Sequence, residues 1–182
     1  MATPKPVRSS KKKVVPLFSS PDAKTGYASP YKPVRGEFAR ARIAVVATRW
    51  NVEIVDALRQ GARECLAEWG VSEKNIVEFR VPGAYEVPLA CMKLLRDADF
   101  DGVVTLGAVI RGDTPHFDFV AGECSRGLMD VQLKTRKPIG FGVLTVNTVQ
   151  QAVERAGPGP ANKGYEAAAA MLEMIRLGRQ LS

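Results

Sequence analysis

Residues 102–120 read GVVTLGAVIRGDTPHFDFV, and the rest of the chain is organised around this stretch. Its first part, residues 103–108, is the continuous apolar and β-branched run of a strand that is buried on both faces. A polar loop follows, and the apolar-periodic segment that opens at Phe117 predicts a helix. His116, the single histidine of the chain, lies in the loop. Because ligands bind outside the carboxyl ends of parallel strands, we expect an active site around His116.

Strand and helix patterns alternate along the rest of the chain. Each strand-like apolar run is followed by a segment whose apolar residues keep helical spacing. Four β–α units in strict alternation predict a parallel sheet between two layers of helices, a flavodoxin-like three-layer α/β sandwich. The predicted strands are residues 43–48, 75–81, 103–108 and 139–144. The first predicted helix runs from Asn51 to Gly70, and the second begins after Pro82-Gly83 and runs through Leu94. The other predicted helices are residues 117–133, 149–155 and 165–177.

Two of these helices allow more detailed predictions. Asn51 stands where a side chain can cap the first helix, and Gly70 is placed to end it. The inner face of the last helix is predicted to consist of Ala168, Met171, Met174 and Ile175, which keep helical spacing.

Positive charge is concentrated at the N-terminus. Residues 1–36 form a basic tail rich in Pro, Ser and Lys, which we predict to be irregular, and residues 37–182 form one domain. Residues 1–42 hold ten basic and two acidic side chains, hence +8, so that −1 remains for the other residues out of the total of +7. A nearly neutral domain does not favour nucleic-acid binding. The prolines of the tail disfavour an organellar transit peptide.

Composition and cysteine usage indicate a protein of the cytoplasm. The chain is 46% hydrophobic and 25% charged, and no apolar run approaches the roughly 18 residues that span a bilayer. Cys65, Cys91 and Cys124 lie in helical patterns without metal-like spacing, which predicts buried free thiols in a reducing compartment. One histidine and scattered cysteines predict no metal site. Neither GxGxxG nor a Walker lysine motif occurs, so a dinucleotide or nucleoside triphosphate site has no support.

Polar and aromatic residues follow the predicted strands at their carboxyl ends. Trp50 follows the first strand, and it fits either a core residue or an aromatic that stacks on a ligand. Glu86 follows the second strand. It fits either a surface residue that complements the helix dipole or a residue that contacts a ligand. His116 fits a helix-start histidine bonded to the chain, but proton transfer is favoured, since it is the only group here that titrates near neutral pH.

Anion binding is predicted at two places. The turn Gly112-Asp113-Thr114 offers backbone N–H groups ahead of a helix, although the Asp113 carboxylate argues against an anion there unless its side chain turns away. Arg155 and Lys163 lie farther along the chain. They fit either charges that complement helix ends or phosphate ligands that reach the site from an adjoining subunit.

Six sequence blocks together resemble the lumazine synthase family of riboflavin biosynthesis. They are ATRWN, VPGAYEVP, GAVIRGDTPHFDFV, FGVLT, QAVERAG and NKGYEAA, which stand in family order over about residues 37–178. The resemblance implies a transferase that condenses 5-amino-6-(D-ribitylamino)uracil with 3,4-dihydroxy-2-butanone 4-phosphate. The products are 6,7-dimethyl-8-ribityllumazine, phosphate and water, and the resemblance implies no cofactor and no metal.

The resemblance also implies an assembly. Members of the family form homopentamers with active sites at subunit interfaces, and the sequence does not decide between free pentamers, paired pentamers and an icosahedral shell. A functional link to riboflavin synthase is a further implication. A non-catalytic flavin- or lumazine-binding paralogue on the same scaffold is the alternative, because fold alone does not establish catalysis.

Roles for individual residues follow from the positions they share with the family motifs. His116 corresponds to the proton-transfer residue, and Trp50 to the aromatic that stacks on the pyrimidine ring. Arg155 corresponds to the phosphate-binding arginine. The other implied substrate contacts are Asn51 beside Trp50; Ala84, Tyr85 and Glu86 for the ribityl chain and ring; Ala108, Val109 and Ile110 for the ring pocket; Asp113 and Thr114 for the phosphate; and Phe141 and Lys163, which together with Arg155 come from an adjacent subunit.

Overall fold

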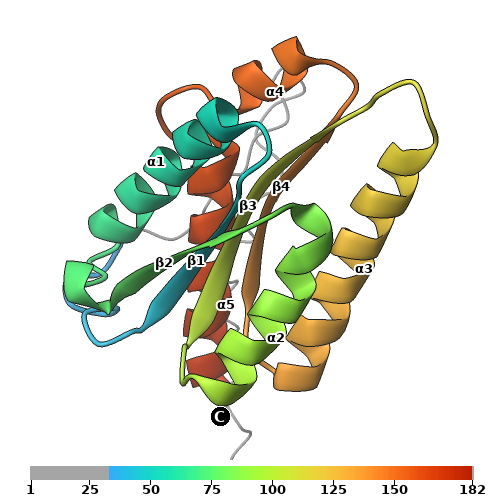
Figure 1. The fold of residues 1–182 in the computed structure, drawn as a ribbon. Coiled ribbons are helices and arrows are strands. Elements are labelled where there is room, and N and C mark those ends of the chain that lie inside the picture. Colours follow the sequence, from blue (N-terminus) through green and yellow to red (C-terminus); the bar gives the residue numbers. More distant parts are fainter. Residues whose placement is uncertain (1–32, 182) are drawn as a thin grey trace, which may run out of the picture.

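The computed structural model describes residues 33–181 and contains the predicted parallel sheet (Figure 1). Its four strands lie in the order β2-β1-β3-β4, and all three neighbouring pairs are parallel. The third and fourth strands each extend two residues beyond the predicted carboxyl end. The strands are β1 (Ile43–Thr48), β2 (Ile76–Val81), β3 (Gly102–Ile110) and β4 (Ile139–Val146).

Helices cover both faces of the sheet, which confirms the flavodoxin-like sandwich. Figure 1 shows α1 and α5 on one face and α2 and α3 on the other. The helices are α1 (Val52–Glu68), α2 (Val87–Asp97), α3 (His116–Thr135), α4 (Val149–Arg155) and α5 (Lys163–Gln180), with single 3₁₀ turns η1 (Glu73–Asn75) and η2 (Ala84–Glu86).

Two hydrophobic cores lie on the two sides of the sheet. Side chains alternate along a strand, so Val45 of β1 packs in the core under α1 and α5, and Val46 packs in the core under α2 and α3. Every residue of β1 is buried, as expected for a strand covered on both faces.

The predicted inner face of the last helix needs one correction. Ala168, Met171 and Ile175 are buried, but Met174 is 52% exposed. Buried positions on α5 also include Ala167 and Leu172. The buried stripe therefore runs through residues 164, 167–169, 171–172 and 175, and Met174 lies just outside it.

The strand order creates a crevice at the carboxyl ends of β1 and β3. These strands are neighbours, but the helix that follows β1 packs on one face of the sheet and the helix that follows β3 packs on the other. No connection crosses between the two strand ends, which is the position where flavodoxin-like sheets bind ligands. The crevice therefore lies between Trp50 and the loop that leads to His116.

The predicted tail falls almost wholly outside the described residues. Residues 33–36 are exposed, whereas the side chain of Phe38 is fully buried against Trp69. Glu37 forms an ion pair with Arg176 of α5. None of the helices within residues 33–181 combines the length and the apolar character needed to cross a bilayer.

Candidate active site

A cavity of about 670 Å³ occupies the crevice at the carboxyl ends of β1 and β3. We call it the first cavity. Its walls come from the last residues of β1 and β3, from the segments that follow β1, β2 and β3, and from the start of α3. Ten of the predicted site residues line it: Trp50, Asn51, Ala84, Tyr85, Glu86, Ala108, Val109, Ile110, Thr114 and His116.

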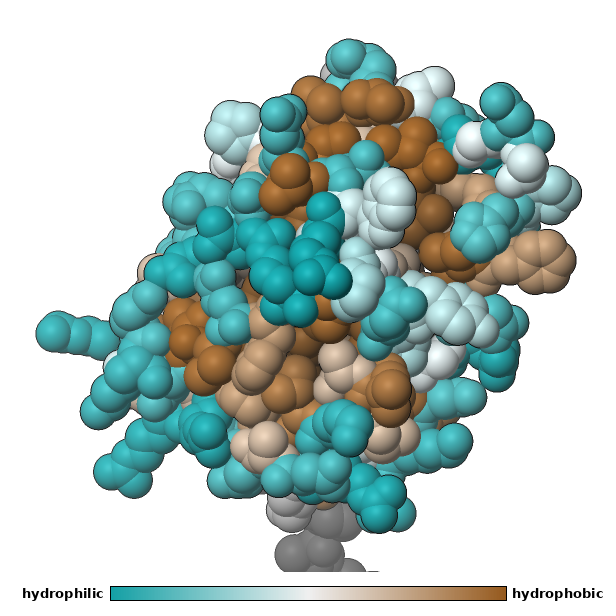
Figure 2. Space-filling view, viewed as in Figure 1, coloured by the Kyte–Doolittle hydropathy of each residue, from teal (hydrophilic) through white to brown (hydrophobic). Residues whose placement is uncertain are grey.

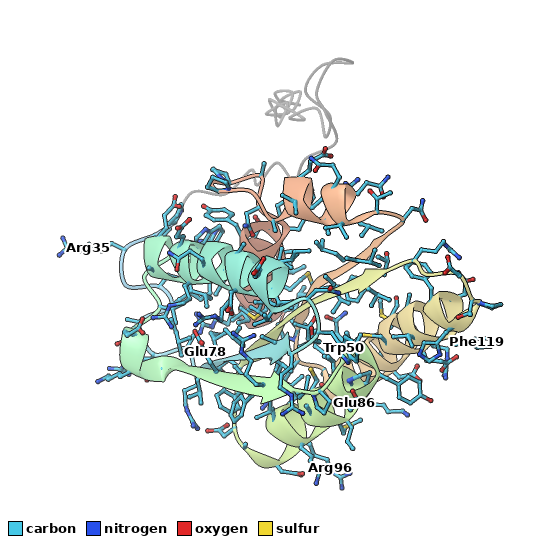
Figure 3. The ribbon with its side chains drawn as sticks, turned by 45° about the horizontal axis from the view of Figure 1, so that its top comes forward. Arg35, Trp50, Glu78, Glu86, Arg96 and Phe119 are labelled. Atoms are coloured by element: carbon cyan, nitrogen blue, oxygen red, sulfur yellow. The ribbon has the colours of Figure 1, made fainter. Side chains whose placement is uncertain are left out.

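Trp50 is an exposed residue of the first cavity. Its side chain is 73% exposed, so the core alternative is wrong for this tryptophan. Figure 3 shows Trp50 and Glu86 next to one another, although they follow different strands. Gly83 makes this approach feasible, because a Cβ atom on it would lie 3.3 Å from both Trp50 Cδ1 and Glu86 Oε2. The indole therefore offers a free aromatic face beside a carboxylate.

Asn51 has a different local role from the predicted cap. It occupies the N-cap position of α1, but its side chain makes no capping hydrogen bond. Its backbone is left-handed, with φ 56° and ψ 47°, a conformation that asparagine tolerates better than most residues. The amide nitrogen Nδ2 instead donates to the carbonyl oxygen of Ala108 at 2.9 Å. Asn51 thus ties the end of β1 to β3 at the base of the first cavity.

Glu86 has a position that fits both predicted alternatives. It stands at the N-cap position of α2, where a negative charge complements the helix dipole, and it also lines the first cavity. Its Oε2 atom accepts a hydrogen bond from the backbone N–H of Gly83 at 2.8 Å. This bond fixes the carboxylate, which can accept further hydrogen bonds from a hydroxyl-bearing ligand.

His116 is the first residue of α3, one residue earlier than the predicted helix start, and it is exposed in the wall of the first cavity. Within residues 33–181 its imidazole has no hydrogen-bond partner, so the structure does not contain the alternative of a histidine bonded to the chain. The imidazole is free to exchange protons with a bound molecule. Thr114 and Gly112 line the cavity beside it, whereas the exposed Asp113 is not part of the wall.

A second cavity, of about 500 Å³, lies along the edge strand β4. Phe141, Arg155 and Lys163 line it, so the structure brings these three predicted residues together. None of them lines the first cavity of the same chain. Within one chain the predicted site residues therefore form two groups, and Asp113 belongs to neither.

The cations of the second cavity have partners on their own helices. Arg155 Nη1 donates to the carbonyl oxygen of Gln151 at 3.0 Å, as expected for a cation at a helix C-terminus. Lys163 Nζ lies 2.7 Å from Glu166 Oε2, and both side chains are largely buried. Because Arg155 is exposed, most of its donors can still bind an anion.

Several lining residues were not among the sequence predictions. Phe117, Phe119 and Val120 contribute an apolar wall from the start of α3, and Thr48 and Gly83 also line the first cavity. The spacing of Phe117 and Val120 on one helix face was the available signal for part of this wall. In the second cavity, Glu166 was missed.

The cysteines offer no nucleophile in this site. All three are free and buried, as predicted. Burial raises the pKa of the Cys124 thiol to about 11, so it is protonated at neutral pH. Within residues 33–181 no group of three His, Cys, Asp or Glu side chains is placed to hold a metal ion.

The fold and the first cavity define a flavodoxin-like α/β protein with a cavity of small-molecule size at the switch point of its sheet. The family described as 6,7-dimethyl-8-ribityllumazine synthase matches residues 40–179. A curated relative named 6,7-dimethyl-8-ribityllumazine synthase, from Desulfovibrio desulfuricans (strain ATCC 27774 / DSM 6949 / MB), is 51% identical over 140 residues, which cover 77% of this chain and 90% of the relative. The chain belongs to the 6,7-dimethyl-8-ribityllumazine synthase family.

Proposed function

We propose that this chain is a transferase of riboflavin biosynthesis that makes 6,7-dimethyl-8-ribityllumazine. It condenses 5-amino-6-(D-ribitylamino)uracil with 3,4-dihydroxy-2-butanone 4-phosphate and releases phosphate and water. The observation that carries this proposal is the family match over residues 40–179, together with a first cavity that holds Trp50, Glu86 and His116.

The first cavity is suited to the ribitylaminouracil. The exposed face of Trp50 can stack on the pyrimidine ring. Glu86 accepts hydrogen bonds from ribityl hydroxyls beside Ala84 and Tyr85. The ring lies against the backbone of residues 108–110. Asn51 supports this wall through its bond to Ala108.

Proximity supplies most of the rate acceleration. An amine and a ketone condense readily once they are held together, and correct orientation of two reactants is worth up to about 7–11 kcal/mol of barrier. His116 transfers protons as the amine attacks, water leaves and phosphate departs. This general acid–base contribution is the smaller share, on the order of 10²-fold.

The phosphate is bound by Arg155, with Lys163 nearby and Phe141 as an aromatic contact, from the second cavity of a neighbouring copy. The amides around Asp113 and Thr114 provide the remaining phosphate contacts. The partition of these residues between two cavities supports a site shared between copies in a homopentamer.

Exposed apolar residues support such an assembly. Phe119, Met129 and Leu133 lie on one side of α3 and are 53–69% exposed. Figure 2 shows further hydrophobic residues at the surface between α4 and the upper end of α3, and Val149 and Val153 of α4 are among the exposed ones. Apolar surface of this kind is characteristic of subunit interfaces.

Co-assembly of two variants tests the shared site. Trp50→Ala removes a first-cavity residue and Arg155→Ala a second-cavity residue, so each homogeneous assembly should have low activity at substrate concentrations below the wild-type KM. Random mixing should restore intact sites at roughly a quarter of the interfaces, because each interface takes one cavity from each of two chains. Activity that stays at the mean of the two variants would contradict a shared site.

The same assay separates catalysis from binding alone. Mixing the two substrates with the wild-type protein should produce the absorbance of the lumazine product. Binding of the product without turnover would mean a non-catalytic paralogue.

We further propose a cytoplasmic location, which the buried free thiols support, and delivery of the product to riboflavin synthase.

A further inference from the structure

Arg111 lies between Ile110 and Gly112, two residues that line the first cavity, and it contacts several other residues. The proposed function gives it no role. Arg111 directly follows β3, and its backbone N–H donates to the carbonyl oxygen of Val146 at 2.9 Å. Its guanidinium donates to both carboxylate oxygens of Asp118, at 2.8 and 3.2 Å. Nε donates to Asn147 Oδ1 at 3.1 Å. The guanidinium also lies 4.2 Å from the ring centroid of Phe117.

These contacts join three segments that meet at the site. Phe117 and Asp118 are the two residues after His116 in the first turn of α3. Asn147 directly follows β4, whose last residues line the second cavity. Arg111 therefore connects the turn that carries His116 to the end of the neighbouring strand.

We propose that Arg111 is a positioning residue that holds the first turn of α3 so that the His116 imidazole faces the first cavity. The proposal rests on the proton-transfer role proposed above for His116. Arg111 acts through that residue, because its guanidinium is already directed at Asp118, Asn147 and Phe117.

The loop that leads to His116 needs such a tether. Residues 111–116 are all exposed, and a side chain on Gly112 would meet nothing within 4 Å. Few packing contacts thus fix the loop. A misplacement of about 1 Å at a reacting group costs as much as 10²-fold in rate. A bidentate arginine–carboxylate pair with a stacked ring is a geometry that restrains direction as well as distance.

The contacts of Arg111 with Asp118, Asn147 and Phe117, which we call the clamp, contribute little to overall stability. The side chains of Arg111 and Asp118 are 43% and 59% exposed, and exposed ion pairs contribute little to the free energy of unfolding. The hydrogen bonds from Arg111 lower the pKa of Asp118, so the carboxylate remains charged at neutral pH. Loss of the clamp should therefore change catalysis more than folding.

The test compares Arg111→Ala with Arg111→Lys and with a control, Arg63→Ala. Arg63 is an arginine of α1 that pairs with Glu73 and Glu78 and lines neither cavity. Arg111→Ala should lower kcat roughly tenfold through misplacement of the imidazole, with KM for both substrates within about twofold. Arg111→Lys should recover part of the loss, because lysine keeps the charge but not the fork. Arg63→Ala should leave kcat unchanged.

A double-mutant cycle with His116→Ala distinguishes this role from any other. If Arg111 acts through His116, Arg111→Ala should change nothing further in the His116→Ala background. The single histidine also gives one set of imidazole NMR signals, which should shift or broaden in Arg111→Ala and not in Arg63→Ala.

Three results would overturn the proposal. They are an equal loss in both backgrounds, a rise in KM for the phosphorylated substrate alone, and no loss at all. An unchanged kcat in His116→Ala by itself would instead refute the role of His116, and this proposal with it. If Arg111→Ala does not assemble, Asp118→Asn should show the same pattern, because it removes the charge partner and keeps the shape.

Discussion

The two cavities of this chain differ in what they can recognise. The first has exposed aromatic rings, one carboxylate and one imidazole, and lies at the switch point of the sheet. The second lies along the edge strand β4 and has Arg155 and Lys163, both in contact with groups of their own helices. The difference teaches that one chain holds its aromatic and imidazole groups in one cavity and its cations in another, so the proposed function separates ring binding and proton transfer from phosphate binding. Four predictions would break or sharpen this comparison.

The largest effect is expected from His116 of the first cavity. His116→Ala should lower kcat on the order of 10²-fold, because general acid–base help is lost while the substrates are still held together. Steady-state kinetics on correctly assembled protein would measure it. Clear residual activity is expected, and complete inactivity would contradict the proximity account.

A smaller effect is expected from Arg155 of the second cavity. Arg155→Ala should raise KM for the butanone phosphate roughly tenfold or more, since a charge-assisted hydrogen bond contributes about 1.5–3 kcal/mol. KM for the ribitylaminouracil should change little. Gln150→Ala changes an exposed residue of the same helix that lines neither cavity, and it is the matched control. Equal losses for both substrates would argue against a phosphate role.

Trp50 should show the converse selectivity. Trp50→Ala should weaken binding of the ribitylaminouracil roughly tenfold, because stacking of a base on an aromatic side chain contributes about 1–3 kcal/mol. Trp50→Phe should keep most of the affinity. Calorimetry with the pyrimidine alone would measure both variants. A loss confined to the phosphorylated substrate would break the proposed division between the cavities.

The smallest effect is expected from the ion pairs between α1 and β2, which line neither cavity. This effect is on the free energy of unfolding. The hydrogen bond from Arg80 lowers the pKa of Asp56 below its ordinary 3.8, against the opposing effect of burial. A carboxylate whose pKa is lower in the folded state than in the unfolded state stabilises the fold at pH values above the unfolded-state pKa. This stabilisation is lost as the pH falls through the folded-state pKa.

Asp56→Asn tests this contribution. Asp56 is 42% exposed, so the substitution should cost about 0.2–1 kcal/mol at pH 7 and less at about pH 3, which lies below the ordinary pKa of 3.8. Thermal unfolding at the two pH values would show the difference. kcat at pH 7 should be unchanged, and a change in kcat would mean that this region communicates with a cavity.

Much of the fold follows from local pattern. The run at residues 43–48 and the run that begins at Gly102 are apolar and β-branched, which specifies strands buried on both faces, and their alternation with helical spacing specifies parallel pairing. Two details did not follow. Asn51 takes a left-handed backbone and bonds to Ala108, 57 residues away, and local capping rules contain no such contact. Met174 lies one position off the buried stripe, because the packing of α5 against α1 and β4 decides where that stripe ends.

The sequence by itself determined which residue types follow each strand, and the topology of a parallel sheet then predicted that Trp50, Glu86 and His116 gather at one edge. Only the tertiary structure decided that Phe141, Arg155 and Lys163 line a different cavity from His116, and that Phe119 and Val120 form a wall of the first. The physical reason is that the order of residues and their periodicity fix the local conformation and the side of a strand or helix on which each residue lies. The distance between two side chains on different elements depends instead on how the helices pack across the sheet, which is a property of the whole core.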